Sequence, residues 1–180
     1  AFDEKLHHAA YVVHAVAPEV ELAFKEWARA HTPCVLIGGL AISFYGRARA
    51  TTDCDFLFLS QSQIPAQVPG FKRVRPHAFQ HLATHVEIEV LDPDFLQMEA
   101  DLAHRLFSTA GEHDGVKVVS RVGLIASKLL RFSRQDQADI EHLLDGMNAD
   151  SLEAIFEELR DWPLNLSQRH KLSQFESDAE

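Results

Sequence analysis

The sequence predicts an α+β protein: a small mixed β-sheet with flanking helices, followed by a C-terminal helical portion. Strand-like segments concentrate between residues 34 and 119, whereas helical periodicity takes over after residue 120. A sheet with an apolar face and helices with an apolar stripe bury those surfaces by packing together. We therefore divide the chain into a sheet region with N-terminal helices, 1–120, and a helical portion packed on it, 121–180.

The individual elements follow from local patterns. Short apolar or alternating runs predict strands at 34–37, 53–59, 71–75, 85–91 and 116–119. Amphipathic periodicity predicts helices at 1–31 with an interruption near Pro18, and at 40–45, 95–107, 121–133, 136–146 and 151–161. Gly38-Gly39 is expected to form a sharp turn, 60–70 to form a loop, and 163–180 to form a short helix with a loose acidic end.

Composition limits the class of protein. Of the 180 residues, 46% are hydrophobic, which is enough for a folded core. No apolar run approaches the ~18 residues that span a bilayer, and the first residues do not resemble a signal peptide. Cys34 and Cys54 both lie in apolar runs, where buried, reduced thiols are expected. These features predict a cytoplasmic protein without a membrane partner.

Charge is distributed unevenly along the chain. The net charge is −10, and residues 135–180 hold 12 acidic and 3 basic side chains. Residues 47–134 hold 11 basic and 10 acidic side chains, so a local basic pocket is possible there. This balance argues against a long, nonspecific nucleic-acid surface. The acidic C-terminal quarter is most simply a solvated helical face, with docking of a protein partner as the alternative.

Two pairs of carboxylates mark the predicted sheet. Asp53 and Asp55 are two residues apart in one strand, so both side chains point to the same face. Glu87 and Glu89 have the same spacing in another strand. Carboxylates that converge repel each other unless a proton or cation lies between them, and hard oxygen ligands suit Mg²⁺. Three such acids are able to hold two metal ions for phosphoryl transfer.

The Gly38-Gly39 pair precedes these acids. Backbone without a Cβ allows a phosphate to approach closely, and a following helix N-terminus adds amide donors. From there the chain reads IGGLAISFYG, then RATTDCD, then an apolar strand with an acid. This order resembles the nucleotidyltransferase superfamily that includes DNA polymerase beta. The closer likeness is to a small bacterial branch with antibiotic nucleotidyltransferases and abortive-infection (toxin–antitoxin) type toxins.

The matching positions extend over roughly residues 34–145. Gly38, Gly39, Gly46, Arg49, Thr51, Asp53 and Asp55 match the motif in order and spacing. Downstream, a lysine-bearing helix and two acids three apart are also similar to the branch, at Lys128, Arg131, Arg134, Asp136 and Asp139. The resemblance implies a nucleotidyltransferase-like fold for the sheet.

The resemblance also implies roles for individual residues. Gly38 and Gly39 would cradle a nucleoside triphosphate, and Asp53 and Asp55 would hold Mg²⁺ as catalytic metal ligands. A third carboxylate would complete the metal site and help to deprotonate the acceptor. That position is usually Asp, but here it is Glu. Glu89 fits best because Ile88-Glu89-Val90-Leu91 matches the apolar–acid–apolar–apolar pattern, and Glu87 is the alternative.

Three further residues are nucleotide-binding candidates by the same resemblance: Arg49, Thr51 and Lys128. Arg49 would either contact phosphate or neutralise the acid cluster. Lys128 would reach the triphosphate or the acceptor. Its alternative is an exposed helix lysine, because Val122, Ile125 and Leu129 already account for the buried face.

The predicted function is Mg²⁺-dependent transfer of a nucleoside monophosphate from an NTP to a hydroxyl, with release of pyrophosphate. The acceptor is left open among a small molecule, a protein and an RNA end. The alternative is a non-catalytic protein of the same fold that binds nucleotide or acts as a partner or antitoxin-like subunit.

Overall fold

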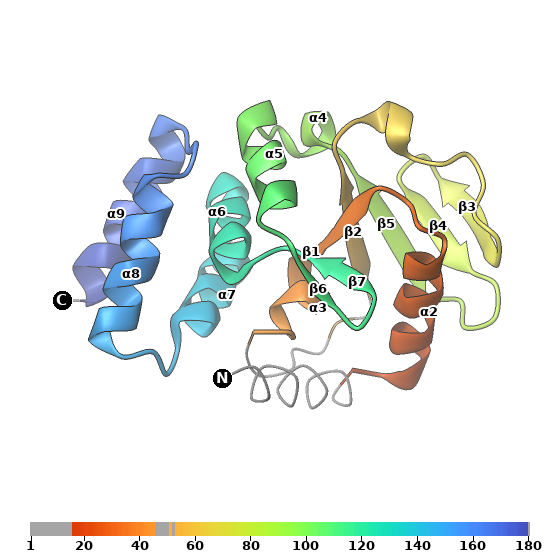
Figure 1. The fold of residues 1–180 in the computed structure, drawn as a ribbon, viewed down its shortest axis with the longest axis horizontal. Coiled ribbons are helices and arrows are strands. Elements are labelled where there is room, and N and C mark those ends of the chain that lie inside the picture. The colour runs from red at the N-terminus through yellow and green to blue at the C-terminus, as the bar shows by residue number, and fades with distance from the viewer. Residues whose placement is uncertain (1–15, 46–50, 52, 180) are drawn as a thin grey trace.

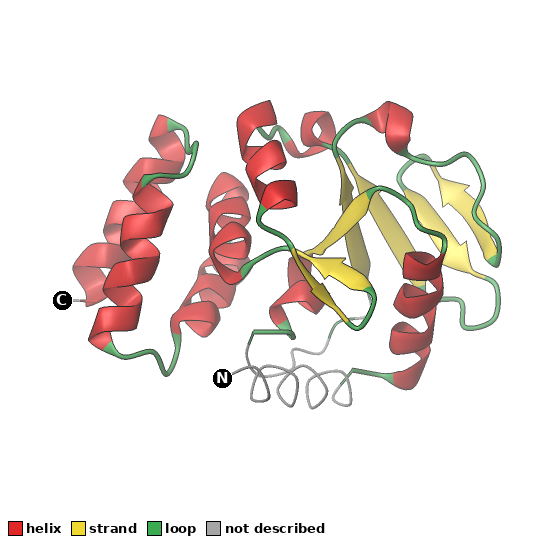
Figure 2. Cartoon of the chain, viewed as in Figure 1, coloured by secondary structure: helices red, strands yellow, loops and turns green. Residues whose placement is uncertain are grey.

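The computed structural model describes residues 16–45, 51 and 53–179. Its centre is one mixed sheet with the strand order β3-β4-β5-β2-β1-β7-β6 (Figure 1; Figure 2). The strands are β1 (Cys34–Ile37), β2 (Cys54–Phe58), β3 (Phe71–Arg75), β4 (Ala78–His81), β5 (Glu87–Leu91), β6 (Gly111–His113) and β7 (Val116–Val118). The described helices are α2 (Pro18–Arg29), α3 (Gly38–Ile42), α4 (Pro93–Leu96), α5 (Ala100–Ser108), α6 (Arg121–Arg131), α7 (Arg134–Leu144), α8 (Ala149–Arg160) and α9 (Leu166–Ala179). This architecture is the predicted α+β class.

The middle of the sheet is built by strands that are distant in sequence. β2 is antiparallel to β1 and parallel to β5, and β1 is parallel to β7. The outer strands are added as antiparallel neighbours, with β4 on β5, β3 on β4 and β6 on β7. The three central strands β5, β2 and β1 therefore bring together the segments that contain the predicted acids and the Gly-Gly pair.

An aromatic cluster anchors α2 to one face of the sheet. Trp27 is fully buried, and its ring centroid lies 6.0 Å from that of Phe56 and 5.2 Å from those of Phe71 and Phe79. These three phenylalanines come from β2, β3 and β4, so a single helix residue joins three strands. Because side chains alternate along each strand, the acids at odd positions of β2 and β5 lie on the opposite face.

The C-terminal helices pack mainly on one another. α6 contacts α3, α7, α8 and α9, and its buried side includes Val122, Ile125 and Leu129, as predicted. In Figure 1, α8 and α9, in blue, lie farthest from the sheet, with α6 and α7 between them and the strands. The α3–α6 contact thus connects the end of β1 directly with the C-terminal helices.

The observed elements differ from the predicted ones in five places. β4 and β6 form where no strand was expected, and α9 extends over 14 residues instead of being a short helix with a loose end. The expected helix 95–107 is divided into α4 and α5, because Gln97 adopts a left-handed conformation with φ 53°. α3 begins at Gly38, since this one glycine, with φ 75°, completes the turn. The predicted helix over 1–15 lies outside the described residues.

Candidate active site

The two carboxylates of Asp55 and Glu89 meet on neighbouring strands. β2 and β5 run parallel with Asp55 in register with Glu89, and the two side chains share a hydrogen bond. Burial, followed by the charge and the hydrogen bond of Glu89, raises the pKa of Asp55 to about 7. The charge of Asp53 adds to this effect and that of Lys128 opposes it. The pair is therefore a partly buried site that favours a proton or a cation.

Gly38 lies directly against this pair. Ile37, the last residue of β1, is in register with Asp55, and Gly38 follows it with φ 75°. A Cβ added to Gly38 would overlap the Asp55 carboxylate and would lie 3.0 Å from its Cγ. Gly39 follows in the first turn of α3. The absence of a Cβ at Gly38 thus makes room for the Asp55 carboxylate at the end of β1.

Asp53 and Thr51 form the approach to β2. Asp53 is exposed and precedes the strand, on the same face as Asp55 by the alternation of the chain. The Thr51 hydroxyl lies 3.3 Å from both the amide nitrogen and the carbonyl oxygen of Asp53. Thr51 therefore shapes the backbone that carries Asp53. Arg49 and Gly46 lie outside the described residues, so both interpretations of Arg49 stay predictions.

Glu87 has a different environment from Glu89. It lies opposite Gln80 on β4, and its Oε2 is 2.5 Å from Nη2 of Arg75. Glu89, in contrast, is the residue in register with Asp55. Of the two candidates for a third carboxylate, Glu89 is the one in contact with the aspartate.

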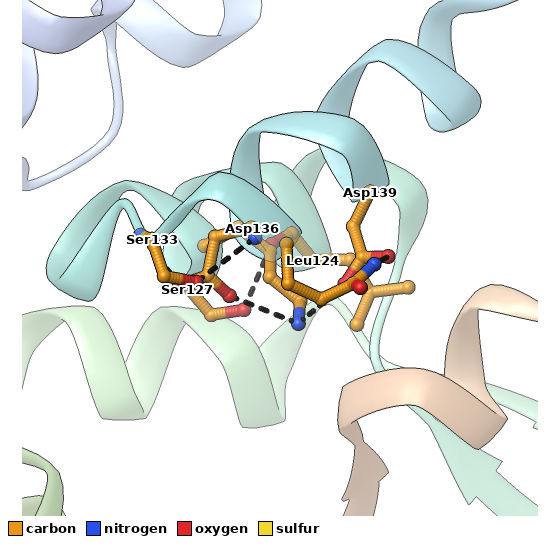
Figure 3. A network of polar contacts seen from close by, with 7 residues as sticks. Leu124, Ser127, Ser133, Asp136 and Asp139 are labelled. Carbon is orange, nitrogen blue, oxygen red and sulfur yellow. Dashed lines mark hydrogen bonds and ion pairs between the residues drawn. The ribbon is translucent and has the colours of Figure 1, made fainter.

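Lys128 is not an exposed surface lysine. Its side chain is 14% exposed, and Nζ lies 3.2 Å from Oδ1 of Asp136 and 2.9 Å from Oδ2 of Asp139. Asp136 and Asp139 project from α7 toward this point, as Figure 3 shows. Because the charge of Lys128 also acts on Asp55, this ion-pair cluster borders the carboxylate pair.

The partners of Lys128 are themselves fixed. Ser133 caps α7: its hydroxyl accepts from the Asp136 backbone amide at 3.1 Å, while the Asp136 carboxylate accepts from the Ser133 amide at 3.0 Å. Burial by itself would raise the pKa of Asp136, but the hydrogen bonds from Ser133 and the charge of Lys128 lower it. Asp139 also accepts a hydrogen bond from Gln135 at 2.9 Å. The buried carboxylates of this cluster are therefore compensated by one lysine and by hydrogen bonds.

Sequence reasoning left Arg75 and the acids Asp136 and Asp139 without an assigned role. The spacing of the two acids was visible in the motif, but their common partner is formed only when α6 and α7 pack. Arg75 belongs to a visibly basic run, FKRVR. The face to which its side chain points depends on a shift in strand register between Arg73 and Arg75. No local pattern of the sequence indicates that shift.

Asp55 and Glu89 provide part of the ligand set that a divalent cation needs. Asp55 and Glu89 offer adjoining oxygen ligands, and the raised pKa of Asp55 indicates a position that favours a proton, which a cation could replace. Mg²⁺ commonly takes only one or two protein carboxylates. Within the described ranges, no three His, Cys, Asp or Glu side chains form a ready-made metal cluster. The role of Asp53 as a metal ligand stays a prediction.

These features define a class: an α+β protein with paired strand carboxylates beside a glycine turn, the arrangement expected for transfer of a phosphorylated group. Residues 14–179 match the family described as a nucleotidyltransferase of unknown function, DUF6036. The chain belongs to this family. No match was found among curated proteins. In the described part of the chain, no helix combines the length and apolar character needed to cross a membrane.

Proposed function

We propose that this protein is a Mg²⁺-dependent nucleotidyltransferase, which transfers a nucleoside monophosphate from an NTP to a hydroxyl and releases pyrophosphate. The observation that carries the proposal is the contact between Asp55 and Glu89 beside Gly38. The two carboxylates lie on adjacent strands, and the pKa of Asp55 is raised to about 7. A fold that keeps two acids in contact at a cost in stability is typical of a functional site.

Asp55 and Glu89, together with Asp53, would hold the metal. When bound, Mg²⁺ supplies charge neutralisation at the α-phosphate and lowers the pKa of the acceptor hydroxyl. Glu89 would also accept the proton of that hydroxyl, because β5 lies on the side of β2 opposite to β1 and Gly38. Thr51 acts as a positioning residue, since it holds the backbone of Asp53.

The nucleotide would bind on the β1 side of the pair. The backbone of Gly38 and Gly39 at the start of α3 would cradle the triphosphate, and Lys128 would contribute positive charge from α6. Asp136 and Asp139 hold the Lys128 ammonium in place, so the lysine acts as a fixed charge near the site rather than as a mobile arm. Arg49 would add a second cation from the segment before Asp53.

Incubation with an NTP labelled at the α-phosphate, Mg²⁺ and a cell extract tests the proposal. We expect label to be transferred to an acceptor by the native protein and not by Asp55→Asn or Glu89→Gln. The matched control is Glu112→Gln, an exposed strand carboxylate on β6 at the far edge of the sheet, which should retain transfer. Undiminished transfer by both Asp55→Asn and Glu89→Gln would refute the assignment.

A second candidate is a non-catalytic nucleotide-binding or partner subunit of the same fold. It is favoured by the glutamate at the third carboxylate position and by the lack of a ready three-carboxylate cluster in the described residues. Titration with each NTP, with and without Mg²⁺, separates the two candidates. Binding of NTP without any labelled product would favour this second function.

A further inference from the structure

The face of the sheet that carries Asp55 and Glu89 continues as a polar surface toward edge strand β3. Ala78 of β4 is in register with Glu89, and Arg75 of β3 is in register with Ala78. Arg75, Ala78, Glu89 and Asp55 thus form one row across four strands. In the neighbouring row, Lys72 lies opposite Gln80, and Gln80 lies opposite Glu87.

A β-bulge places Arg75 on this face. Arg73 is in register with Phe79 and Arg75 with Ala78, so Val74 is an extra residue in β3. In a regular strand Arg75 would point to the same face as Arg73, which packs over the Phe79 ring at 5.4 Å on the α2 side. Because of the bulge, Arg75 instead joins Lys72 on the carboxylate face, and its ion pair with Glu87 confirms that direction. Bulges that redirect a side chain are common beside active sites.

The two cations remain accessible. Lys72 is exposed, and the Arg75 side chain is 56% exposed although it is paired with Glu87. A guanidinium has five N–H donors, so an arginine held by one carboxylate is still able to bind a second anion. Glu87 therefore acts as a support that fixes the direction of Arg75. The small, buried Ala78 is the residue that lies between Arg75 and Glu89 in their row.

We propose that Lys72, Gln80 and Arg75 form an anion subsite for the acceptor, and that the acceptor is the end of a single nucleic-acid strand. The inference rests on the proposed function, which places the reacting hydroxyl at Asp55 and Glu89. The nucleotide side of that pair is occupied by β1, α3 and α6, so the acceptor enters from the opposite, β4–β3 side. There it meets cations about two strand spacings, roughly 10 Å, from Glu89.

A nucleic-acid strand fits this surface because its negative charge repeats at short intervals. Lys72 and Arg75 lie in rows marked by Gln80 and Ala78, two residues apart on β4, which separates the rows by roughly 7 Å. Two cations contact few phosphates, so only the strand's end is held. That small footprint agrees with a net charge of −10, which disfavours a long nucleic-acid surface.

Charges on an edge strand also have a simpler explanation, because they prevent sheets from pairing edge to edge. That role does not depend on which face of the strand carries the charge. An anion subsite does depend on it, so Arg73 and Arg75 provide a matched pair: two arginines on one strand, on opposite faces.

Fluorescence anisotropy with a labelled short single-stranded oligonucleotide, as RNA and as DNA of one sequence, tests this directly in the full chain. The titrations contain neither NTP nor Mg²⁺, so they do not require catalysis. We expect Arg75→Gln and Lys72→Gln each to weaken binding several-fold and to lower the slope of log K against log salt by about 0.7. Arg73→Gln should leave both quantities unchanged, and thermal melting would verify that all variants are folded.

The outcomes separate this inference from the proposed function. Strand binding that depends on Arg75 and Lys72 but not on Arg73 supports the subsite, even where no label is transferred. Equal weakening by Arg73→Gln would show a nonspecific edge charge and overturn it. No strand binding, or binding only of inorganic phosphate or a sugar phosphate, would also overturn it and leave a small acceptor for the enzyme.

Discussion

Two groups of acids in this protein lie close together and differ in how their charge is balanced. Asp55 and Glu89 face each other, and the pKa of Asp55 is raised to about 7. Asp136 and Asp139 are buried, but they share Lys128, and the pKa of Asp136 is lowered. The second pair is a completed structural cluster. Among the described residues, the first pair has no ion pair as close as those of Lys128 with Asp136 and Asp139, so a proton or a bound cation would balance its charge.

The comparison teaches that burial alone does not distinguish structural from functional carboxylates. Both pairs are at least partly withdrawn from solvent, and both adjoin the same lysine. The difference lies in the direction of the pKa shift, which reports whether the fold supplies compensating hydrogen bonds and charge. The predictions below disturb one group at a time.

The largest effect is expected from removing the cation of the balanced cluster. Lys128→Gln leaves the carboxylates of Asp136 and Asp139 buried without their partner, so the free energy of unfolding at pH 7 should fall by about 3 to 5 kcal/mol. Urea denaturation measures it. The matched control is Lys25→Gln: Lys25 also contacts two carboxylates, Glu21 at 2.7 Å and Asp114 at 3.3 Å, but in a more exposed setting. Its loss should cost less than about 1 kcal/mol, and equal losses would contradict the comparison.

The next prediction is a gain in the free energy of unfolding, caused by a substitution at Asp55. The pKa of Asp55 rises from 3.8 to about 7, so the folded chain holds a proton that the unfolded chain releases. The free energy of unfolding contributed by this group is therefore lost progressively as the pH rises from 3.8 to about 7, by on the order of 2 to 4 kcal/mol.

Asp55→Asn removes this loss of stability at high pH, because an asparagine side chain does not ionise. Without metal at pH 8, the variant should melt at least about 5 °C above the native protein, and the difference should disappear near pH 4. Mg²⁺ should raise the melting temperature of the native protein at pH 8 and not that of Asp55→Asn. A variant that is less stable than the native protein at pH 8 would show that Asp55 is compensated after all.

A smaller effect concerns the space beside the pair. Gly38→Ala introduces a Cβ that overlaps the Asp55 carboxylate, whereas Gly146→Ala has nearly the same φ, 74° against 75°, and meets no atom within 4 Å. The left-handed conformation should cost each variant about 1 to 2 kcal/mol, and overlap should cost Gly38→Ala about 1 kcal/mol more. Chemical denaturation of both variants measures the difference. In an Asp55→Ala background the extra loss should vanish, and its persistence would place the clash elsewhere.

The smallest effect concerns the cap of the balanced cluster. Ser133→Ala removes the hydroxyl that accepts from the Asp136 amide and donates to its carboxylate, so α7 should lose about 1 kcal/mol. Because one of the hydrogen bonds that lower the pKa of Asp136 is lost, its pKa should also rise, which NMR titration of the side-chain carboxyl measures. Ser120→Ala, which removes a comparable cap from α6, should cost a similar free energy without moving that pKa.

The elements that sequence predicted well are those with strong local patterns. The apolar run 34–37 appears as β1, and the alternating run 85–91 appears as β5 over 87–91. The three helices predicted between residues 121 and 161 match α6, α7 and α8 closely. β4 and β6 were missed because AFQH and GEH are short, show no clear apolar alternation, and form strands by pairing with β5 and β7. Both strands are stabilised by pairing with a neighbouring strand, and a short stretch of sequence does not reveal that pairing.

The sequence by itself determined which side chains share a face, because the two-residue period of a strand is a local property: Asp53 with Asp55, and Glu87 with Glu89. Only the tertiary structure decided which of these acids meet, because register between β2 and β5 is set by packing over long sequence separations. It aligned Glu89 with Asp55, turned Glu87 toward Arg75, and seated Lys128 between two acids of α7. Local periodicity orients a side chain, whereas contact between strands and helices decides its charge state.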